Sequence, residues 1–326
     1  MCFGGGAGPR AGNFRCVFLP AVVNLCLSLI FPSLTFAGPR PQQTHPPSAS
    51  VPELKSRAEA GNSMAAFELA RLLLEADPSS PGFDLALDWL RSFASLDHFH
   101  AKFLLGYLYE QGRGLPRDYA KAAENYQAAA LHGYDLAQNN LGSLYLYGLG
   151  VPRDVQKAFD LLLAAAQQGN PTVQCNLATL FLNGTGTPQD LTQAVKWLGV
   201  AADHGYAPAQ RKLAVFYFKG VGVSVDYSEA ARWEALASQQ GEAKAQTDLA
   251  YLYETGKGVP LDYVAAYVWY ARSIAAGEKS GVDRLKSLSL IMTRKQLQQA
   301  VALAATPLSP TRTASVDSRI RTIPVD

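Results

Sequence analysis

The residues of this chain that could ligate a metal are few. His98 and His100 flank Phe99 and follow Asp97, and this is the one cluster with ligand chemistry. Zinc needs three or four converging ligands, whereas side chains two positions apart on a helix point away from each other. No cysteine or further histidine lies nearby in the sequence. We therefore expect no metal site and no cofactor.

Residues for nucleophilic catalysis are equally sparse. Cys175 has no sequence-adjacent histidine that could activate it as a thiolate. The chain contains no Ser-x-x-Lys followed by Ser-Asp-Asn and no Gly-x-Ser-x-Gly elbow. These observations favour a protein that is not an enzyme.

Two further motifs could bind ligands, but their regular recurrence favours a structural role. A Gly-x-Gly pair after a strand can cradle phosphate, and aspartates can ligate metal ions. Here each pair follows an expected helix, and an aspartate comes four residues after its second glycine. The first glycine is expected to end one helix and the aspartate to cap the next. The first glycines are Gly112, Gly148, Gly184, Gly220 and Gly256, and the aspartates are Asp118, Asp154, Asp190, Asp226 and Asp262.

These motifs belong to a repeat with a period of 36 residues. The glycines that mark it are Gly133, Gly169, Gly205, Gly241 and Gly277. Extended back to Gly61, the period defines six units, numbered here one to six, and each unit shows the pattern of two helices. In the first helix a leucine recurs, and apolar residues three or four positions away share its face. The leucines are Leu69, Leu105, Leu141, Leu177, Leu213 and Leu249. In the second helix one position holds every tryptophan of the chain, which predicts core residues there: Trp89, Trp197, Trp233 and Trp269.

The pattern Ala-x3-Leu-Gly-x2-Tyr-x2-Gly-x-Gly-Val-x2-Asp-x3-Ala-x2-Trp-x3-Ala-Ala-x2-Gly resembles the Sel-one-like repeat (SLR) family, a relative of the tetratricopeptide repeats. The resemblance covers the six units, and only the first lacks the Gly-x-Gly pair, with Ala76 and Pro78 in its place. It implies an all-α fold: a right-handed α-solenoid of antiparallel helix pairs. In bacterial relatives it implies adaptor, regulatory or assembly roles, often in the cell envelope. A capped helix from Thr293 to about Ala305 is expected to cover the end of the stack.

The first 37 residues have the layout of a signal peptide. Arg10 and Arg15 precede a mostly apolar stretch, and small residues at Thr35 and Ala37 permit cleavage before Gly38. We expect an exported protein, periplasmic or extracellular, that is not inserted in a membrane after cleavage. An uncleaved membrane anchor is the alternative.

Composition divides the rest of the chain into three parts. Residues 38–52 carry five prolines and predict a flexible linker. Residues 53–305 form the repeat region, and residues 306–326 read as a loose polar tail.

The net charge indicates which class of ligand the protein binds, and the cysteine content indicates whether it has a disulfide. Without residues 1–37 the chain has as many basic residues as its 27 acidic ones, so no strong positive field would attract nucleic acid. Cys175 would be the only cysteine left, which excludes an internal disulfide. We expect a protein or peptide as the partner, and no nucleic acid.

Binding specificity is expected at positions that vary from unit to unit. In tetratricopeptide-like stacks the first helices line a concave groove, and three positions of each first helix lie off the core face. Amides, hydroxyls and tyrosines there suit an extended peptide or a protein surface, although an ordinary solvated face is the simpler alternative. A hydrolase of the cell envelope, or a protein that binds glycan or peptidoglycan, is the alternative function. The predicted groove residues are Asn140, Ser143, Tyr147, Asn176, Thr179, Asn183, Lys212, Val215, Lys219, Asp248, Tyr251 and Thr255.

Overall fold

The computed structural model describes residues 51–62, 64, 65, 68, 69, 72, 81–95 and 98–308. All of them belong to a unit of the chain that spans Arg40–Asp326. The predicted signal peptide, most of the predicted linker and most of the predicted tail lie outside the described residues, as do Ala76 and Pro78.

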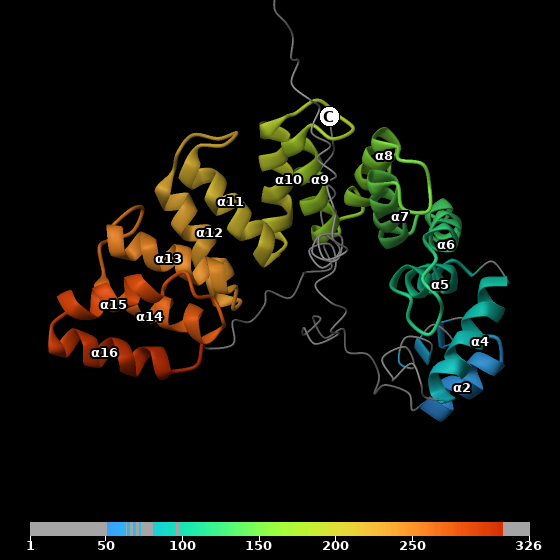
Figure 1. Cartoon of the computed structure of the whole chain (residues 1–326), viewed down its shortest axis with the longest axis horizontal. Helices are drawn as coiled ribbons and strands as arrows, with labels where there is room; N and C mark the ends of the chain where they lie inside the picture. Colours follow the sequence, from blue (N-terminus) through green and yellow to red (C-terminus); the bar gives the residue numbers. More distant parts are fainter. Residues whose placement is uncertain are drawn as a thin grey trace, which may run out of the picture. The chain divides into compact units, whose positions relative to one another are not determined.

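Every regular element in the described part of the chain is a helix (Figure 1). The helices are α2 (Val51–Glu59), α4 (Pro81–Ser95), α5 (Phe99–Gln111), α6 (Tyr119–Leu131), α7 (Asp135–Tyr147), α8 (Val155–Ala166), α9 (Pro171–Asn183), α10 (Leu191–Asp203), α11 (Ala207–Lys219), α12 (Tyr227–Gln239), α13 (Ala243–Thr255), α14 (Tyr263–Ala275), α15 (Val282–Ile291) and α16 (Arg294–Ala305). None of these helices is long and apolar enough to cross a membrane.

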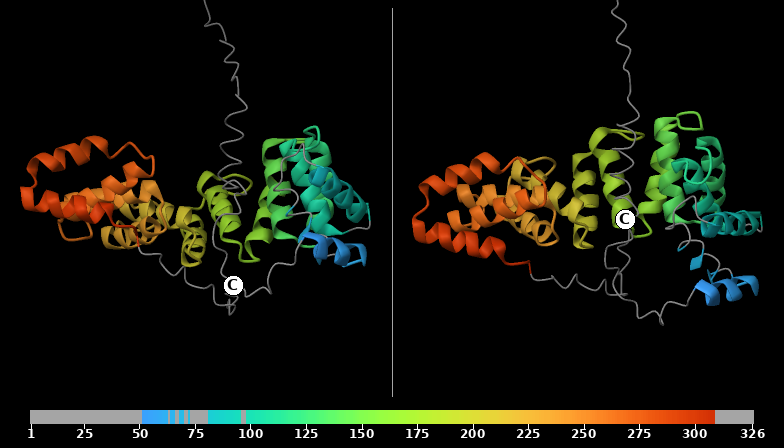
Figure 2. Two further views of the ribbon diagram at one scale, coloured as in Figure 1. Left: turned by 90° about the horizontal axis from the view of Figure 1, so that it is seen from below. Right: turned by 60° about the horizontal axis from the view of Figure 1, so that its bottom comes forward.

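From unit two to unit six the helices form consecutive pairs, one pair for each 36-residue unit. Units two to six consist of α5 with α6, α7 with α8, α9 with α10, α11 with α12, and α13 with α14. Each second helix also packs on the first helix of the following unit. The order of neighbours is the same in the two views of Figure 2. The fold is therefore an all-α solenoid, as the period predicts.

Short polar motifs set the ends of these helices. All five predicted aspartates are N-caps that accept hydrogen bonds from backbone N–H groups, as Asp118 does from Ala120 and Lys121. The first glycine of each Gly-x-Gly pair ends a first helix in the left-handed conformation, as at Gly112 with φ of 67°. Both predictions are confirmed.

The second glycine of each pair has a role that the sequence did not reveal. It also has a positive φ, and it lies against the start of the second helix of the preceding unit. A Cβ at Gly258 would collide with the carbonyl oxygen of Tyr227, and one at Gly150 with the backbone of Tyr119. This loop is therefore a packing contact between neighbouring units.

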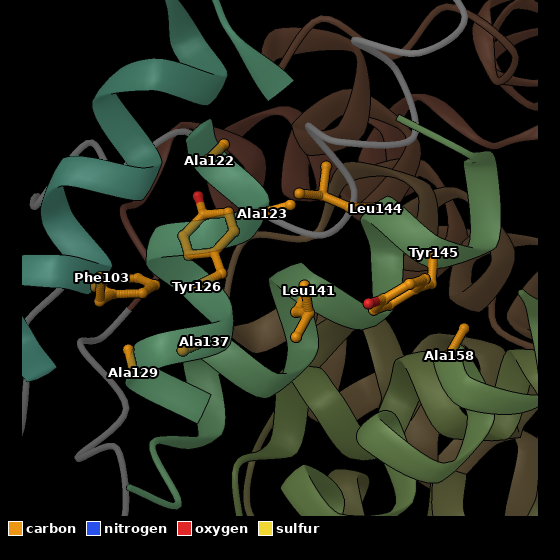
Figure 3. Packing of buried hydrophobic residues seen from close by; sticks show 10 residues of the cluster. All are labelled: Phe103, Ala122, Ala123, Tyr126, Ala129, Ala137, Leu141, Leu144, Tyr145 and Ala158. Carbon is orange, nitrogen blue, oxygen red and sulfur yellow. The ribbon is translucent and has the colours of Figure 1, made fainter. Parts of the chain in front are cut away.

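The core is a series of clusters along the stack. In the cluster of units two and three, Phe103 of α5, Tyr126 of α6 and Leu141 of α7 pack together (Figure 3). The repeated leucines Leu105, Leu141, Leu177, Leu213 and Leu249 are all buried. Trp233 is buried as predicted, whereas Trp89, Trp197 and Trp269 are half-buried at the edges of clusters.

A repeated glutamine joins each of units four, five and six to the unit before it. Gln174, Gln210 and Gln246 lie on first helices, and each donates a hydrogen bond from Nε2 to the carbonyl of the residue eight positions earlier. Those carbonyls belong to the end of the preceding second helix, where each also accepts a bond from the backbone N–H of the glycine three residues later, so the glutamine adds a second donor to the same oxygen.

Both ends of the described stack extend beyond the predicted units. The capped helix predicted from Thr293 is confirmed as α16, with a capping box between Thr293 and Gln296. The sequence did not predict α15, and α14 packs on both α15 and α16. At the other end α2 begins at Val51, two residues inside the predicted linker.

Candidate functional site

The predicted groove residues occupy three positions on the first helices of units three to six. The third position lies in the last turn, and its side chain is exposed in all four units: Tyr147, Asn183, Lys219 and Thr255. The other two positions are half-buried in units four to six, at Asn176, Thr179, Lys212, Val215, Asp248 and Tyr251. In unit three they are enclosed, with Asn140 only 3% and Ser143 only 5% exposed. The third position thus presents its side chains most fully to solvent.

The first position forms a ladder of contacts between neighbouring first helices. Each rung joins a residue to the one 37 positions later. Asn176 donates from Nδ2 to Asn139 Oδ1 over 3.0 Å, and Lys212 Nζ lies 3.6 Å from Cys175 Sγ. Arg211 and Asp248 form the next rung, with 3.9 Å between Nη1 and Oδ2. The chemistry of the rungs therefore changes along the stack, from amide pair to ammonium–thiol contact to ion pair.

Hydroxyl groups on this face are satisfied within their own helices. Ser143 and Thr179 donate to the carbonyls of Asn139 and Cys175, four residues earlier. Thr255 does the same to Tyr251, over 2.8 Å. These bonds fix the side-chain rotamers and leave the hydroxyl oxygens as acceptors.

The middle rung holds Cys175 as a thiol. Burial raises the pKa of Cys175, and the nearby Lys212 ammonium only partly opposes this shift. A thiol with a raised pKa is a poor nucleophile, because the thiolate is the reactive form. The arrangement suits Cys175 to packing and Lys212 to presenting a positive charge.

A buried acid lies beside the last rung. Glu234 of α12 is only 3% exposed, and burial, with the nearby Asp248 carboxylate, raises its pKa to about 9. Burial also raises the pKa of Asp248, while Arg211 opposes that shift. Glu234 is therefore neutral at pH 7, and the charges of this rung are Arg211 and Asp248, with Glu242 3.7 Å from Arg211.

Units two and six each contain a pair of a buried tyrosine and a glutamate. Units three and four have two leucines at the matching positions. Tyr126 donates to Glu110 over 2.5 Å, and Tyr270 donates to Glu254 over 2.8 Å. Burial and the partner carboxylate raise the pKa of both tyrosines. The matching positions in the other two units hold Leu146 with Leu162 and Leu182 with Leu198.

The structure corrects the interpretation of the two histidines. The rings of His98 and His100 do not point away from each other, because their centroids lie 5.6 Å apart. The reason is that His98 precedes α5 as its N-cap, with an extended backbone, so helical side-chain directions do not apply to it. Burial lowers the pKa of both histidines, and His98 lowers that of His100 further.

These rings pack with aromatic neighbours. Phe99 stacks near His132 at 5.5 Å, and His100 meets Tyr134 edge-on at 5.1 Å. Asp97 lies outside the described residues. Within the described ranges, no group of three or more His, Cys, Asp or Glu side chains could hold a metal ion.

The repeat region matches a known family model in six consecutive segments. The model is that of the Sel1 repeat, and it matches residues 63–98, 100–134, 135–170, 171–206, 207–242 and 243–278. No curated protein shows a significant match to the chain.

Two solved structures share the fold over most of the chain. One is a protective antigen present in uropathogenic Escherichia coli strains, which displays an SLR fold; it is 30% identical with a TM-score of 0.69, over 78% of this chain and 55% of that one. This chain thus spans little more than half of that protein. The other is a Sel1 repeat protein from Oxalobacter formigenes, 26% identical with a TM-score of 0.61, over 76% of this chain and 97% of that one.

Proposed function

Because the chain belongs to the Sel1 repeat family, whose repeats generally serve as protein-interaction scaffolds, we propose that it is a non-enzymatic scaffold that binds a partner protein. The partner's segment lies in extended form along the first helices of units three to six. The observation that carries this proposal is the third position, where Tyr147, Asn183, Lys219 and Thr255 are all exposed and all different. The leucine position of the same helices is invariant and buried.

The ladder supports the same role. Its rungs hold Asn176, Lys212 and Asp248 between neighbouring helices, which reduces the side-chain entropy lost on binding. Amides, an ammonium and a carboxylate in succession provide different hydrogen-bonding groups for one extended chain. The absence of a strong net positive charge in residues 38–326 favours a protein over nucleic acid as the ligand.

We also propose that the protein works outside the cytoplasm, in the bacterial cell envelope or beyond it. The signal-peptide layout of residues 1–37 supports this location. The related protein of uropathogenic Escherichia coli is described as a protective antigen, which fits a protein accessible from outside the cell. Regulation of a sensor and assembly of envelope machinery are both roles that such a scaffold serves.

Site-specific crosslinking tests the binding surface. A photoreactive amino acid replaces Asn183 or Lys219 in the full chain, and replaces Gln156 or Lys196 as matched controls, because these two are exposed on second helices. We expect the same partner to be crosslinked from Asn183 and Lys219 and not from the controls. Crosslinks from the second helices alone would contradict the proposal.

Hydrolysis of nitrocefin and of peptidoglycan is measured on the same preparation. Turnover that is lost on replacing Asn176 or Lys212 would show that the first-helix surface is an active site, and would exclude a purely binding role.

A further inference from the structure

A second surface of the molecule is formed by the loops that join the two helices of a unit. The residue before each aspartate N-cap differs along the stack. In units two to four it is polar and donates to a carbonyl at the end of the first helix: Arg117 to Gln111, Arg153 to Leu146 over 3.1 Å, and Gln189 to Leu182 over 2.8 Å. These side chains cover acceptors that the helix leaves unpaired.

Units five and six break this rule. Val225 and Leu261 occupy the same position and are 52% and 56% exposed. Neither side chain can donate a hydrogen bond, so neither can make the bond to a first-helix carbonyl that Arg117, Arg153 and Gln189 make in the preceding units. Units five and six therefore expose apolar side chains at the position where units two to four have polar ones.

The two positions lie in loops of neighbouring units that contact each other. Gly258, three residues before Leu261, lies against the backbone of Tyr227, which is two residues after Val225. Tyr227 is itself 37% exposed. We call Val225, Tyr227, Lys257 and Leu261 the loop-edge surface.

Lys257 of the loop-edge surface lies against three aromatic rings. Its Nζ is 5.2 Å from the ring centroid of Phe218, 5.3 Å from that of Tyr227 and 5.7 Å from that of Tyr251. Rings at these distances attract an ammonium group and hold it in place. Among the described residues, no carboxylate lies within 4 Å of this ammonium.

Lys219 is a second cation of unit five, exposed and directly after Phe218 in the sequence. In the part of the chain that the structure describes, no carboxylate lies within 4 Å of its ammonium, although its charge lowers the pKa of Asp248.

We propose that the loop-edge surface docks a segment of a partner protein in which an acidic side chain is flanked by apolar side chains. The carboxylate pairs with Lys257, whose ammonium the three rings already position. The apolar side chains cover Val225, Tyr227 and Leu261 and remove them from water.

This surface adjoins the first-helix positions, since Tyr251, one of the predicted groove residues, supplies one of the rings beside Lys257. Its own four residues come from loops and from the start of a second helix, in units five and six only. The proposal goes beyond the scaffold role above because it names the chemistry of a second contact.

Selection from a displayed library of random peptides tests the chemistry. The full chain is immobilised, and bound peptides are sequenced and resynthesised for affinity measurement. We expect enriched peptides that place aspartate or glutamate beside leucine, isoleucine or phenylalanine. Enrichment of basic peptides, or no enrichment, would overturn the proposal.

Matched variants locate the binding surface. The double variant Val225→Gln with Leu261→Gln introduces the residue that unit four has at this position, so we expect it to fold, which circular dichroism and thermal unfolding check. Its affinity for the selected peptide should fall at least tenfold, and that of Lys257→Gln severalfold with a weaker dependence on salt. The control Arg153→Gln, at the same position in unit three, should bind normally.

Equal binding by the double variant and the unaltered chain would place the peptide elsewhere and contradict the proposal. An Asn183→Ala variant separates this test from that of the first-helix surface. It should leave the selected peptide bound, whatever its effect on the crosslinked partner.

Discussion

Glu234 occupies the second-helix position that Leu162 and Leu198 fill in units three and four. In units two and six a tyrosine stands there and donates to a glutamate on the first helix. Unit five has Phe218 where those glutamates stand, so Glu234 faces no polar side chain from that first-helix position, and its Oε2 has no hydrogen bond. A buried carboxylic acid without a full set of partners is costly when it ionises.

This acid should make the stability of the protein depend on pH. The pKa of Glu234 is raised from 4.5 to about 9 on folding, so between these values the folded state holds a proton that the unfolded state lacks. The contribution of Glu234 to stability should therefore be fully present below pH 4.5 and fall by about 1.4 kcal/mol per pH unit as pH rises through this window. Urea unfolding of Glu234→Leu should lose this slope and be more stable than the unaltered chain at pH 8.

The exposed Glu124, replaced by glutamine, serves as the control and should keep the slope. A pH dependence that is the same in Glu234→Leu and in the unaltered chain would show that other groups cause it.

Gly205 and Gly258 have similar backbone angles but different surroundings. Replacing each by alanine therefore distinguishes the cost of backbone strain from the cost of a steric clash. Gly205 has φ of 80°, and a Cβ added there would have no atom within 4 Å, whereas Gly258 has φ of 70° and faces the Tyr227 backbone. Gly205→Ala should cost about 1 kcal/mol, from the left-handed conformation alone. Gly258→Ala should cost about 1 to 3 kcal/mol more, because the loop must also move. Equal losses in thermal unfolding would show that the loop contact is unimportant.

At the scale of the helices, the repeated glutamines form a small network between units. The Oε1 of Gln210 accepts from Gln240 over 2.8 Å, and that of Gln174 lies 3.3 Å from His204 Nδ1. Each of these partners is the C-cap of a second helix, 30 residues after the glutamine. In unit six the C-cap is Ala276, and the Oε1 of Gln246 is left without a partner.

Ala276→Gln should therefore complete the network. The backbone of Ala276, with φ of −80° and ψ of 4°, matches that of Gln240, with φ of −82° and ψ of 0°, so a glutamine fits there without strain. We expect a gain of about 0.5 to 1.5 kcal/mol in denaturant unfolding, the usual net value of one buried hydrogen bond. Gln240→Ala should show a loss of similar size. A destabilised Ala276→Gln variant would contradict the assigned role of the C-cap position.

At the scale of the whole stack, the extensive contacts of each helix pair within the described residues are with its neighbours along the chain. The free energy of unfolding of such a stack is approximately the sum of the stabilities of its units and of the interfaces between them. A destabilising substitution at one end should therefore affect mainly that end. The C-terminal end is covered by α15 and α16, and Leu288 of α15 is buried in the cluster that joins them to α14.

Leu288→Ala should loosen this end first. A buried leucine replaced by alanine costs about 2 to 5 kcal/mol, and here the loss falls on one terminal interface. Hydrogen exchange should become faster in α14, α15 and α16 while α7 to α10 keep their protection. Leu177→Ala, in the middle of the stack, is the comparison and should speed exchange in units three to five. Uniform acceleration in both variants would show that the stack unfolds as one cooperative block.

Local signals made most of the fold predictable. A glycine that ends a helix and an aspartate that caps the next act within a few residues, so Gly112 and Asp118 could be interpreted without a structure. The second glycine of each loop could not, since its neighbour, such as Tyr227 for Gly258, lies 31 residues away in the sequence. The prediction that the side chains of His98 and His100 point away from each other was wrong, because the exact start of α5 was not predictable.

The sequence by itself determined the period, the helix pairs, their caps and the family, because all of these follow from patterns within one 36-residue unit. Only the tertiary structure decided which variable residues are enclosed, as Asn140 and Ser143 are, and which remain exposed, as Asn183 is. It also brought residues 37 positions apart into the ladder and left Val225 and Leu261 uncovered at the loop edge. The physical reason is that burial and pairing of a side chain depend on the neighbouring unit against which its own unit packs.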